Sequence, residues 1–395
     1  MAGIGSASFL ADVGHEIPTA LLPSLLTSTL GAPAAALGLI EGISDGLAGA
    51  ARFGGGALAD DPARRRTVAV GGYATTAVLA AATGAATSVW QVGVLRAAAW
   101  TARSLRVPAR NALLADIVPK SAYGRAYGFE RSMDNFGAVF GPLLALGLVA
   151  LFSVRTAIAV SVVPGLLAAL AIVYAIRKAP KAEHRDKVAL RIRLRPVLHG
   201  DLGRLMIGVS AFELGNIAAT LLILRATDLL TPGHGTKAAT SLALGLYVAY
   251  NIAAALFSVP AGRVADRLGP RGPVKVMVAG TALFALALFA VGSTNWLLLF
   301  VPFLAAGAAI GCVETAEHAA VAALAPTALR GSAFGLLATV QSLGNFAASA
   351  VAGLLWTAIS PTAAFTYITA WTVLAVFGIG INSRLRTPTE RTSNA

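Results

Sequence analysis

Two clusters of histidine and carboxylate side chains are the strongest candidates for chemistry in this sequence. In each cluster, three residues are spaced so that a helix would place them on one face. Imidazoles and carboxylates bind and release protons, and both are ligands of divalent transition metals. The sequence therefore predicts proton binding at these faces, with metal binding as the alternative and no metal assigned. The residues are Asp12, His15 and Glu16 in the first cluster, and Glu314, Glu317 and His318 in the second.

The segments around both clusters are apolar, and so is the chain as a whole. Of its 395 residues, 56% are hydrophobic and 12% are charged. A soluble domain of this size needs more polar surface, whereas a lipid bilayer accepts an apolar one. The formal net charge of +13 comes largely from Lys and Arg in short loops, which indicates membrane topology rather than a nucleic-acid surface. We therefore expect a membrane protein that contacts the lipid bilayer and does not bind nucleic acid.

Twelve segments are long and apolar enough to cross the hydrocarbon, which takes about 20 residues. They form two sets of six, so the predicted fold is an all-α membrane protein with twelve transmembrane helices in two six-helix bundles. The predicted bundles cover residues 1–177 and 204–382, with a connector at 178–203 and a tail at 383–395. The predicted spans are 7–30, 34–58, 67–87, 89–113, 124–152, 155–177, 204–230, 238–262, 273–293, 295–323, 331–356 and 359–381.

Basic residues set the predicted orientation. Lys and Arg follow spans two, four, six and eight and also occupy the tail, whereas the opposite loops are nearly bare. Because cytoplasmic loops carry the excess of Lys and Arg, both termini and the connector are expected in the cytoplasm. The predicted location is the inner (cytoplasmic) membrane, with multiple passes. The single cysteine, Cys312, leaves no intramolecular disulfide.

A charged, glycine-rich hinge follows span eight, and a degenerate copy follows span two. Gly56 and Asp60 of the copy stand 206 positions before their counterparts in the complete hinge. A second pair of matching stretches is offset by 207 positions and includes Gly137 and Gly344. Two matches at nearly one offset indicate a tandem duplication. The complete hinge contains Gly262, Asp266, Arg267, Gly269 and Arg271, and the copy contains Gly56, Asp60 and Arg64.

With two six-span halves and a hinge in each, the whole chain resembles the major facilitator superfamily of secondary transporters. The second hinge matches the family's loop signature, whereas the first has Asp61 in place of a basic residue and Ala63 in place of a glycine. Span five carries Gly137-Ala-Val-Phe-Gly141-Pro142, which is similar to a signature of the superfamily's proton antiporters, although its final glycine is missing. This similarity suggests export. A monomer is expected, because each chain would enclose its own pathway.

The resemblance also implies which residues gate the pathway and which line it. The hinges would latch the cytoplasmic side, with Asp266 accepting hydrogen bonds at the positive end of a neighbouring helix. Spans one, four, seven and ten would line the cavity, where buried carboxylates could carry protons. Glu16 and Glu314 are the preferred proton carriers, whereas Asp12 is a candidate for a fixed ion pair. The further predicted cavity residues are Arg96, Trp100 and Arg103 of span four and Glu213 and Asn216 of span seven.

Two of these predictions leave alternatives open. Arg96 matches the family's span-four arginine, which tunes the protonation of a nearby acid, but it would equally serve as a static partner of Glu41 or Asp45. Trp100 offers a stacking surface to an organic ligand, but a packing role is commoner.

Three functions fit the sequence to different degrees. The first is a proton-coupled exporter of a small organic solute or drug, and the alternative is a proton-coupled exporter of a divalent transition metal ion. A membrane enzyme or channel-like receptor is disfavoured by the half-chain repeat with its mobile hinges. No Gly-x-x-x-x-Gly-Lys-[Ser/Thr] loop and no catalytic triad pattern occurs, so neither a cofactor nor an enzymatic activity is predicted.

Overall fold

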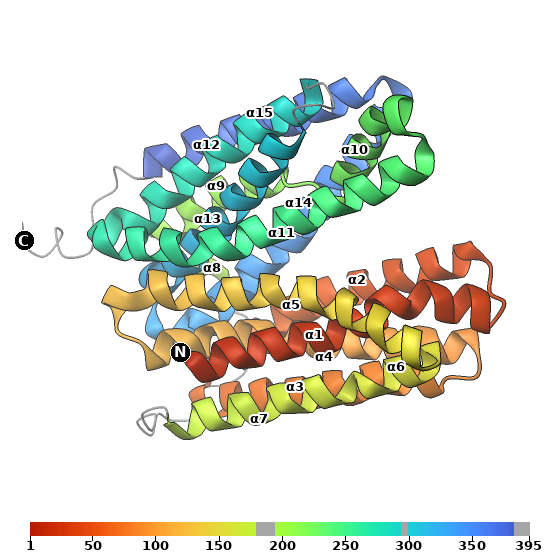
Figure 1. The fold of residues 1–395 in the computed structure, drawn as a ribbon. Coiled ribbons are helices and arrows are strands. Elements are labelled where there is room, and N and C mark those ends of the chain that lie inside the picture. The colour runs from red at the N-terminus through yellow and green to blue at the C-terminus, as the bar shows by residue number, and fades with distance from the viewer. Residues whose placement is uncertain (179–193, 294–298, 383–395) are drawn as a thin grey trace, which may run out of the picture. The chain divides into compact units, whose positions relative to one another are not determined.

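The computed structural model describes residues 1–178, 194–293 and 299–382, and within these ranges the chain is helical with no β-strand (Figure 1). The predicted all-α class is confirmed for this part of the chain. Most of the predicted connector and the whole predicted tail, 383–395, lie outside the described residues.

The first half of the chain forms the helices α1 to α7. A π-helix, Leu25–Thr29, extends α1, and the helical backbone continues through Pro18 and Pro23. The predicted span 155–177 corresponds to one apolar segment long enough to cross a membrane, Val154–Arg177, within which Ser161 separates α6 from α7. The bounds are α1 Ala2–Ser24, α2 Ala34–Leu58, α3 Pro62–Ala82, α4 Val89–Ile117, α5 Tyr123–Leu151, α6 Val154–Val160 and α7 Val162–Lys178.

The second half forms the helices α8 to α15. The predicted span 204–230 is also interrupted, since α9 ends at Glu213 and α10 begins at Ala219. The bounds are α8 Leu194–Val197, α9 Gly200–Glu213, α10 Ala219–His234, α11 Thr236–Arg267, α12 Gly272–Ser293, α13 Phe300–Leu324, α14 Arg330–Ala358 and α15 Pro361–Asn382.

Eight helical segments among the described residues are long and apolar enough to cross a membrane. Each of the twelve predicted spans overlaps a helix or a pair of helices, but α9 and α10 are only 14 and 16 residues long and α4 carries four arginines. The count of twelve spans and the cytoplasmic placement of the termini therefore stay predictions.

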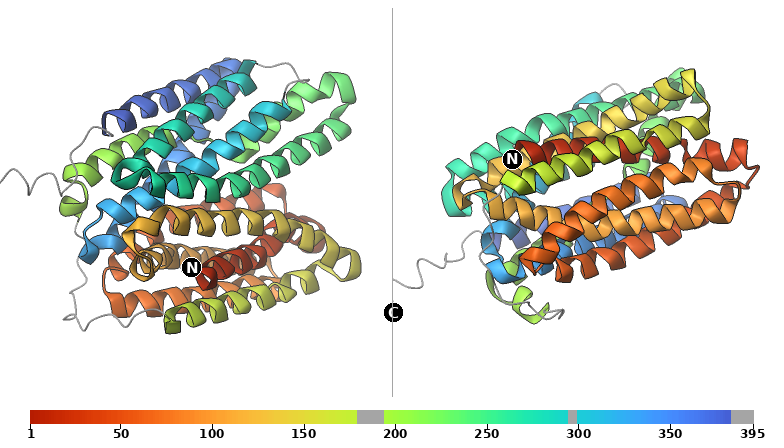
Figure 2. Two further views of the ribbon diagram at one scale, coloured as in Figure 1. Left: turned by 60° about the vertical axis from the view of Figure 1, so that its left-hand side comes forward. Right: turned by 90° about the horizontal axis from the view of Figure 1, so that it is seen from below.

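The chain divides into two compact units that exchange short segments. Unit 1 contains Met1–Pro119, Met133–Leu194 and Ala325–Thr339, and unit 2 contains Lys120–Ser132, Arg195–Leu324 and Val340–Ala395. The start of α5 thus belongs to unit 2 and the start of α14 to unit 1, so these units differ from the predicted bundles, whose boundaries stay predictions. In unit 1, α4 packs on α2 and α3, and α1 packs on α7 (Figures 1 and 2). In unit 2, α13 packs on α11 and α12, and α15 packs on α9 and α12.

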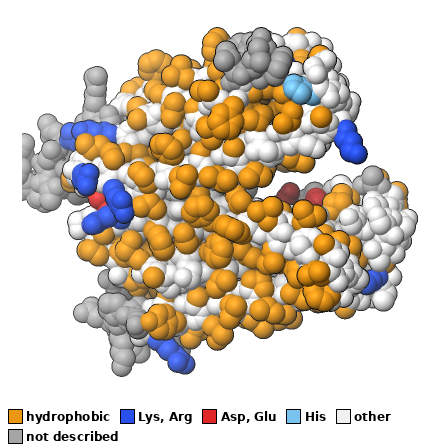
Figure 3. All heavy atoms as spheres, viewed as in Figure 1, with side chains coloured by type: hydrophobic (Ala, Val, Ile, Leu, Met, Phe, Trp, Pro, Cys, Tyr) orange, Lys and Arg blue, Asp and Glu red, His pale blue; other side chains and the backbone are white. Residues whose placement is uncertain are grey.

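Apolar side chains cover much of the molecular surface drawn in Figure 3. Large exposed ones include Leu146 at 70%, Phe289 at 63% and Phe346 at 73% of their full accessible area. Exposure of this kind is unfavourable in water and is expected where a helix faces lipid acyl chains. The surface therefore fits a multi-pass membrane protein.

The turn between α2 and α3 shows how the degenerate hinge is built. Asp61 caps the N-terminus of α3, with its Oδ1 accepting hydrogen bonds from the backbone N–H of Ala63 at 2.9 Å and of Arg64 at 3.4 Å. Pro62 occupies the first turn, where its missing N–H is not needed. The acid that departs from the family's loop signature is therefore the helix cap of this turn.

Candidate functional site

The complete hinge ends at Asp266, whose carboxylate lies at the N-terminus of α5 within unit 2. It accepts hydrogen bonds from the backbone N–H of Gly124 at 2.7 Å and from the backbone N–H and the Nε of Arg125 at 3.0 and 2.9 Å. The helices approach closely here, since a Cβ added to Gly262 would lie 2.1 Å from the Gly124 carbonyl oxygen. One carboxylate thus satisfies two free N–H groups of a helix end and pairs with a guanidinium.

The degenerate hinge makes the equivalent contact within unit 1. Asp60 accepts hydrogen bonds from the backbone N–H of Ser332 at 2.8 Å and from the Ser332 hydroxyl. A Cβ on Gly56 would lie 2.8 Å from the carbonyl oxygen of Gly331, so glycines again allow the close approach. Burial raises the pKa of the Asp60 carboxyl above its usual range, and the hydrogen bonds from Ser332 oppose that rise. The two contacts are related by the sequence repeat.

The predicted hinge arginines differ in exposure. Arg64 is 43% exposed and pairs with Asp61 of its own turn at 3.6 Å. Arg267 is exposed and Arg271 half-buried, while Gly269 supplies the turn with its φ of +74°.

Sequence reasoning missed the charged groups that do lie beside the hinges. Besides Arg125, these are Arg65 and Arg330, which both pair with Asp116 in unit 1. Arg65 also donates from Nε to the carbonyl oxygen of Ala59 at 2.7 Å. Asp116 lies one residue before the end of α4, and an acid at a helix C-terminus, where the helix dipole disfavours it, was the available signal for the cluster.

The first histidine–acid cluster meets α4 as the predicted faces require. Asp12 pairs with Arg103 at 2.8 Å, and the His15 ring lies on the Trp100 ring with centroids 4.1 Å apart. The Arg96 guanidinium lies 4.4 Å from the Trp100 centroid and donates to Glu41 at 3.1 Å. The Trp100 ring therefore packs against protein groups. Arg96 has Glu41 as its carboxylate partner, as the alternative of a static ion pair required.

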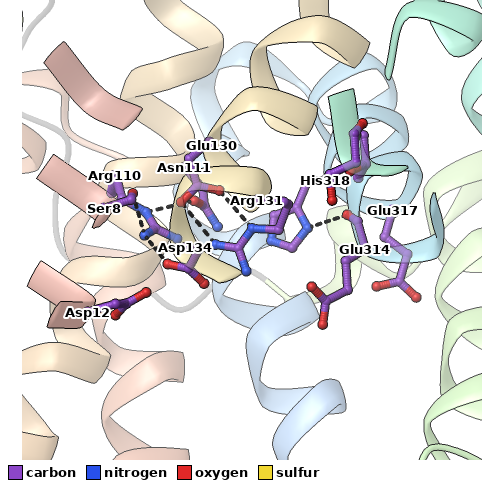
Figure 4. Close-up of polar contacts among 12 residues, drawn as sticks. Ser8, Asp12, Arg110, Asn111, Glu130, Arg131, Asp134, Glu314, Glu317 and His318 are labelled. Carbon is purple, nitrogen blue, oxygen red and sulfur yellow. Dashed lines mark hydrogen bonds and ion pairs between the residues drawn. The ribbon is translucent and has the colours of Figure 1, made fainter. Parts of the chain in front are cut away.

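Asp12 also faces a second carboxyl group, that of Asp134 on α5, within unit 1 (Figure 4). Asp134 in turn pairs with Arg110 at 3.4 Å, and Arg110 donates to Ser8 at 2.9 Å. Asp134 follows Asp12 by 122 positions in the sequence, on the fifth helix, and spacing along the chain gives no sign of this proximity. Neighbouring carboxyl groups can share a proton, so the arrangement extends the cluster beyond α1 and α4.

The glycines of the antiporter-type motif bring α5 against the acids of α1. A Cβ added to Gly137 would lie 2.7 Å from the Cβ of Asp12, and one added to Gly141 would lie 2.4 Å from the Cβ of Glu16. Pro142 lies inside α5. In unit 2, the repeat-related Gly344 would place a Cβ 2.4 Å from that of Glu213. Each unit thus sets a glycine of one long helix against an acidic residue.

A Gly141→Ala substitution is expected to lower the stability of the purified protein by about 1–3 kcal/mol, because the added methyl group overpacks the α1–α5 contact. Thermal unfolding in detergent measures the change. The matched control is Gly147→Ala on the same helix, where a Cβ would meet nothing within 4 Å. Equal stability of both variants would contradict the close contact.

The second cluster lies in unit 2 and contains a deeply buried carboxyl group that has no cationic partner among the described residues. Glu317 is 0% exposed, and its Oε2 accepts a hydrogen bond from Gln341 at 3.0 Å. Its Oε1 has no partner among the described residues. The Nδ1 of His318 lies 2.7 Å from the Glu314 carbonyl oxygen, and Glu314 itself is half-buried beside Glu317 (Figure 4).

The predicted cavity residues Glu213 and Asn216 lie at the break between α9 and α10, also in unit 2. Glu213 accepts a hydrogen bond from the Asn216 amide at 3.0 Å. Side chains of α14 satisfy the unwound backbone, since Asn345 donates to the Asn216 carbonyl at 2.8 Å and Ser349 accepts from the Ala218 N–H at 2.8 Å. Irregular backbone at membrane depth needs such partners and is typical of transporter binding sites.

Among the described residues, no group of three or more His, Cys, Asp or Glu side chains is arranged to hold a metal ion. The candidate metal ligands, Asp12, His15, Glu16, Glu314, Glu317 and His318, all lie within the described ranges.

Comparisons with known proteins agree with this architecture. A profile of the Major Facilitator Superfamily matches residues 4–224 and 205–395. An uncharacterised MFS-type transporter of Methanocaldococcus jannaschii is 28% identical over 369 residues, which cover 92% of this chain and 90% of the relative.

Two solved structures are similar in fold. The human organic anion transporter MFSD10 (TETRAN) has a TM-score of 0.73 at 16% identity, covering 96% of this chain and 99% of its own. A bacterial homologue of the iron transporter ferroportin, in its outward-facing state, has a TM-score of 0.72 at 16% identity, covering 97% and 99%. At this level of identity they share the fold alone.

Proposed function

The chain belongs to the major facilitator superfamily, a family of transporters and not of enzymes, and we propose that it is a proton-coupled exporter of a small organic solute. The observation that supports proton coupling best is Glu317, a fully buried carboxyl group with an amide partner and no cationic one among the described residues. An ionised carboxylate is costly in such a place, and a proton removes the cost.

The surroundings of Glu317 strengthen this proposal. Glu213 and Glu314 act on it electrostatically as like charges. When three acidic groups lie near one another, a proton bound to one of them relieves the repulsion between their negative charges. We propose that the number of protons bound depends on which side of the membrane the site is open to. We propose that Glu317 takes up and releases the coupling proton as the pathway opens alternately to the two sides of the membrane.

The hinge contacts supply the proposed gate. Asp266 and Asp60 each hold the start of a long helix from the other half of the sequence. Contacts of this kind stabilise one conformation and must break in the other, which is the requirement of alternating access. Both contacts are proposed to lie on the cytoplasmic side of the inner membrane, in a monomeric protein.

We propose the substrate class from the chemistry of α1 and α4. Arg96 and Arg103 combine positive charge with the aromatic ring of Trp100, and we propose that in another conformation they exchange their present partners, Glu41 and Asp12, for an organic solute. The alternative, a divalent transition metal ion, rests on the ligand chemistry of His15 and His318 with their neighbouring carboxylates. Solved structures that share this fold are described as an organic anion transporter and as a homologue of an iron transporter, so both classes occur on this fold.

A thermal-shift screen of the purified protein separates the two classes. The probes are lipophilic cations, organic anions and the ions Ni²⁺, Co²⁺, Mn²⁺, Fe²⁺ and Zn²⁺, each at two pH values. Stabilisation by organic probes, followed by their flux in proteoliposomes under a pH gradient, is the expected result. Stabilisation by a metal that is lost in His15→Ala or His318→Ala would replace it with the metal exporter.

A further inference from the structure

A small polar cavity lies inside unit 1, between α1, α3, α4 and α7. Its lining includes His15, Tyr73, Thr76, Arg106 and Gly165. The space open to the centre of a water-sized sphere is about 10 Å³, which suits one water molecule or one monatomic anion and excludes an organic solute.

Three side chains on this cavity have polar atoms that no described residue satisfies. Arg106, Tyr73 and His15 are 3%, 2% and 3% exposed. Among the described residues, no hydrogen-bond partner exists for Nε and Nη1 of Arg106, for the hydroxyl of Tyr73 or for Nε2 of His15. The arginine N–H groups can only donate, and the phenol and imidazole can donate as well. These polar atoms therefore lack a common hydrogen-bond acceptor.

The charge of Arg106 is also left without compensation. Its guanidinium lies over the Tyr73 ring, 3.7 Å from the centroid, and forms no ion pair with the part of the chain that the structure describes. The nearby carboxylate of Asp12 is paired with Arg103 at 2.8 Å, and Glu16 is influenced by Arg103 and Arg96. Arg103 and Arg110 add positive charge around Arg106, as Arg96 and Arg103 do around His15. A buried charge without a partner is strongly unfavourable.

We propose that this cavity is a binding site for one small monovalent anion, such as chloride, held by Arg106, Tyr73 and His15. A water molecule would supply an acceptor but would leave the guanidinium charge uncompensated, whereas a halide supplies both. The site lies within one unit and is separate from the proposed proton site at Glu317. The anion would fix the packing of α1, which carries Asp12 and Glu16, against α3 and α4.

The test uses the full-length protein in detergent, with chloride replaced stepwise by gluconate at constant ionic strength. The expected result is thermal stabilisation that saturates with chloride or bromide and is absent in gluconate. Arg106→Gln and Tyr73→Phe should raise the half-saturating concentration about tenfold or more, since each removes donors to a charged acceptor. Arg204→Gln is the matched control, because its guanidinium is 45% exposed and pairs with Asp201.

Crystals grown in bromide provide the second measurement. An anomalous peak between Arg106 and Tyr73 would place the anion. If Arg106→Gln fails to fold, Tyr73→Phe and the halide dependence of the natural chain decide the matter. Equal thermal stability in gluconate and in chloride, together with the absence of a bromide peak, would overturn the proposal. The cavity would then hold a water molecule rather than an anion. Stabilisation that follows ionic strength, whatever the anion, would overturn it too.

Discussion

Transport by the Asp266→Asn protein is expected to fall at least about tenfold, while its yield and its size-exclusion profile stay near those of the natural chain. Asp266 accepts three hydrogen bonds at the start of α5, two from backbone N–H groups and one from Arg125. Hydrogen bonds to a charged group contribute about 1.5–3 kcal/mol each, and asparagine removes both the charge and one acceptor oxygen. A loss of only 1.4 kcal/mol from one gate conformation changes its population about tenfold.

The matched control for this prediction is Asp61→Asn. Asp61 stands beside the other hinge, and its role in capping α3 is one that asparagine also performs. The measurement is the initial rate of flux in proteoliposomes, per amount of folded protein. A natural rate in Asp266→Asn would show that the contact is not part of the gate, and an equal loss in Asp61→Asn would show that any charge near the hinges matters.

The internal repeat was the most informative feature of the sequence for locating the hinge residues. Because Gly56 and Asp60 recur as Gly262 and Asp266, the sequence identified both acids that lie at helix starts in the structure. A repeat reports positions that share an environment, so it finds equivalent residues without knowing what they touch. It also paired Gly137 with Gly344, and both glycines lie against acidic residues.

Partners distant in the chain were beyond sequence reasoning. Asp266 pairs with Arg125, 141 positions away in the sequence. Spacing shows which side chains share a face of one helix, but it does not show which other helix that face will meet. The same limit explains why the contacts of Asp116 with Arg65 and Arg330 were missed.

The interruption between α9 and α10 had a weak signal in Gly215 and Asn216, which disfavour a helix interior. Hydropathy outweighed that signal, because the whole stretch 204–230 is apolar enough for one span. What fixes the break is Asn345 and Ser349 of α14, which satisfy the freed backbone groups. Such compensation depends on tertiary packing and cannot be read from the segment itself.

The structure changes which acidic residue of α13 is the preferred proton carrier. By pattern alone, Glu314 and Glu317 are alike, and the sequence favoured Glu314. In the structure Glu314 is half-buried and Glu317 is fully buried against Gln341. Small residues flank both Glu314 and Glu317 along α13, so the sequence does not indicate which face of this helix is buried.

The Glu317→Gln protein is therefore expected to lose accumulation of substrate driven by a pH gradient, while it keeps exchange of internal for external substrate. Glutamine has the shape of a protonated glutamate and can keep the hydrogen bond to Gln341, but it binds no proton at any pH. The substitution holds the site in its neutral form. Conformational cycling with substrate should continue, whereas the coupling between proton and substrate movement should disappear.

Glu314→Gln is the matched control, since it makes the same chemical change one helical turn away. Proteoliposomes are loaded with substrate to measure exchange, and a pH gradient of known sign is imposed to measure accumulation. Coupled accumulation at the natural level in Glu317→Gln would remove Glu317 from the proton pathway. Loss of coupling in Glu314→Gln alone would restore the preference drawn from the sequence. Because exchange reports folding and substrate binding in the same vesicles, a loss of accumulation without a loss of exchange isolates the proton step.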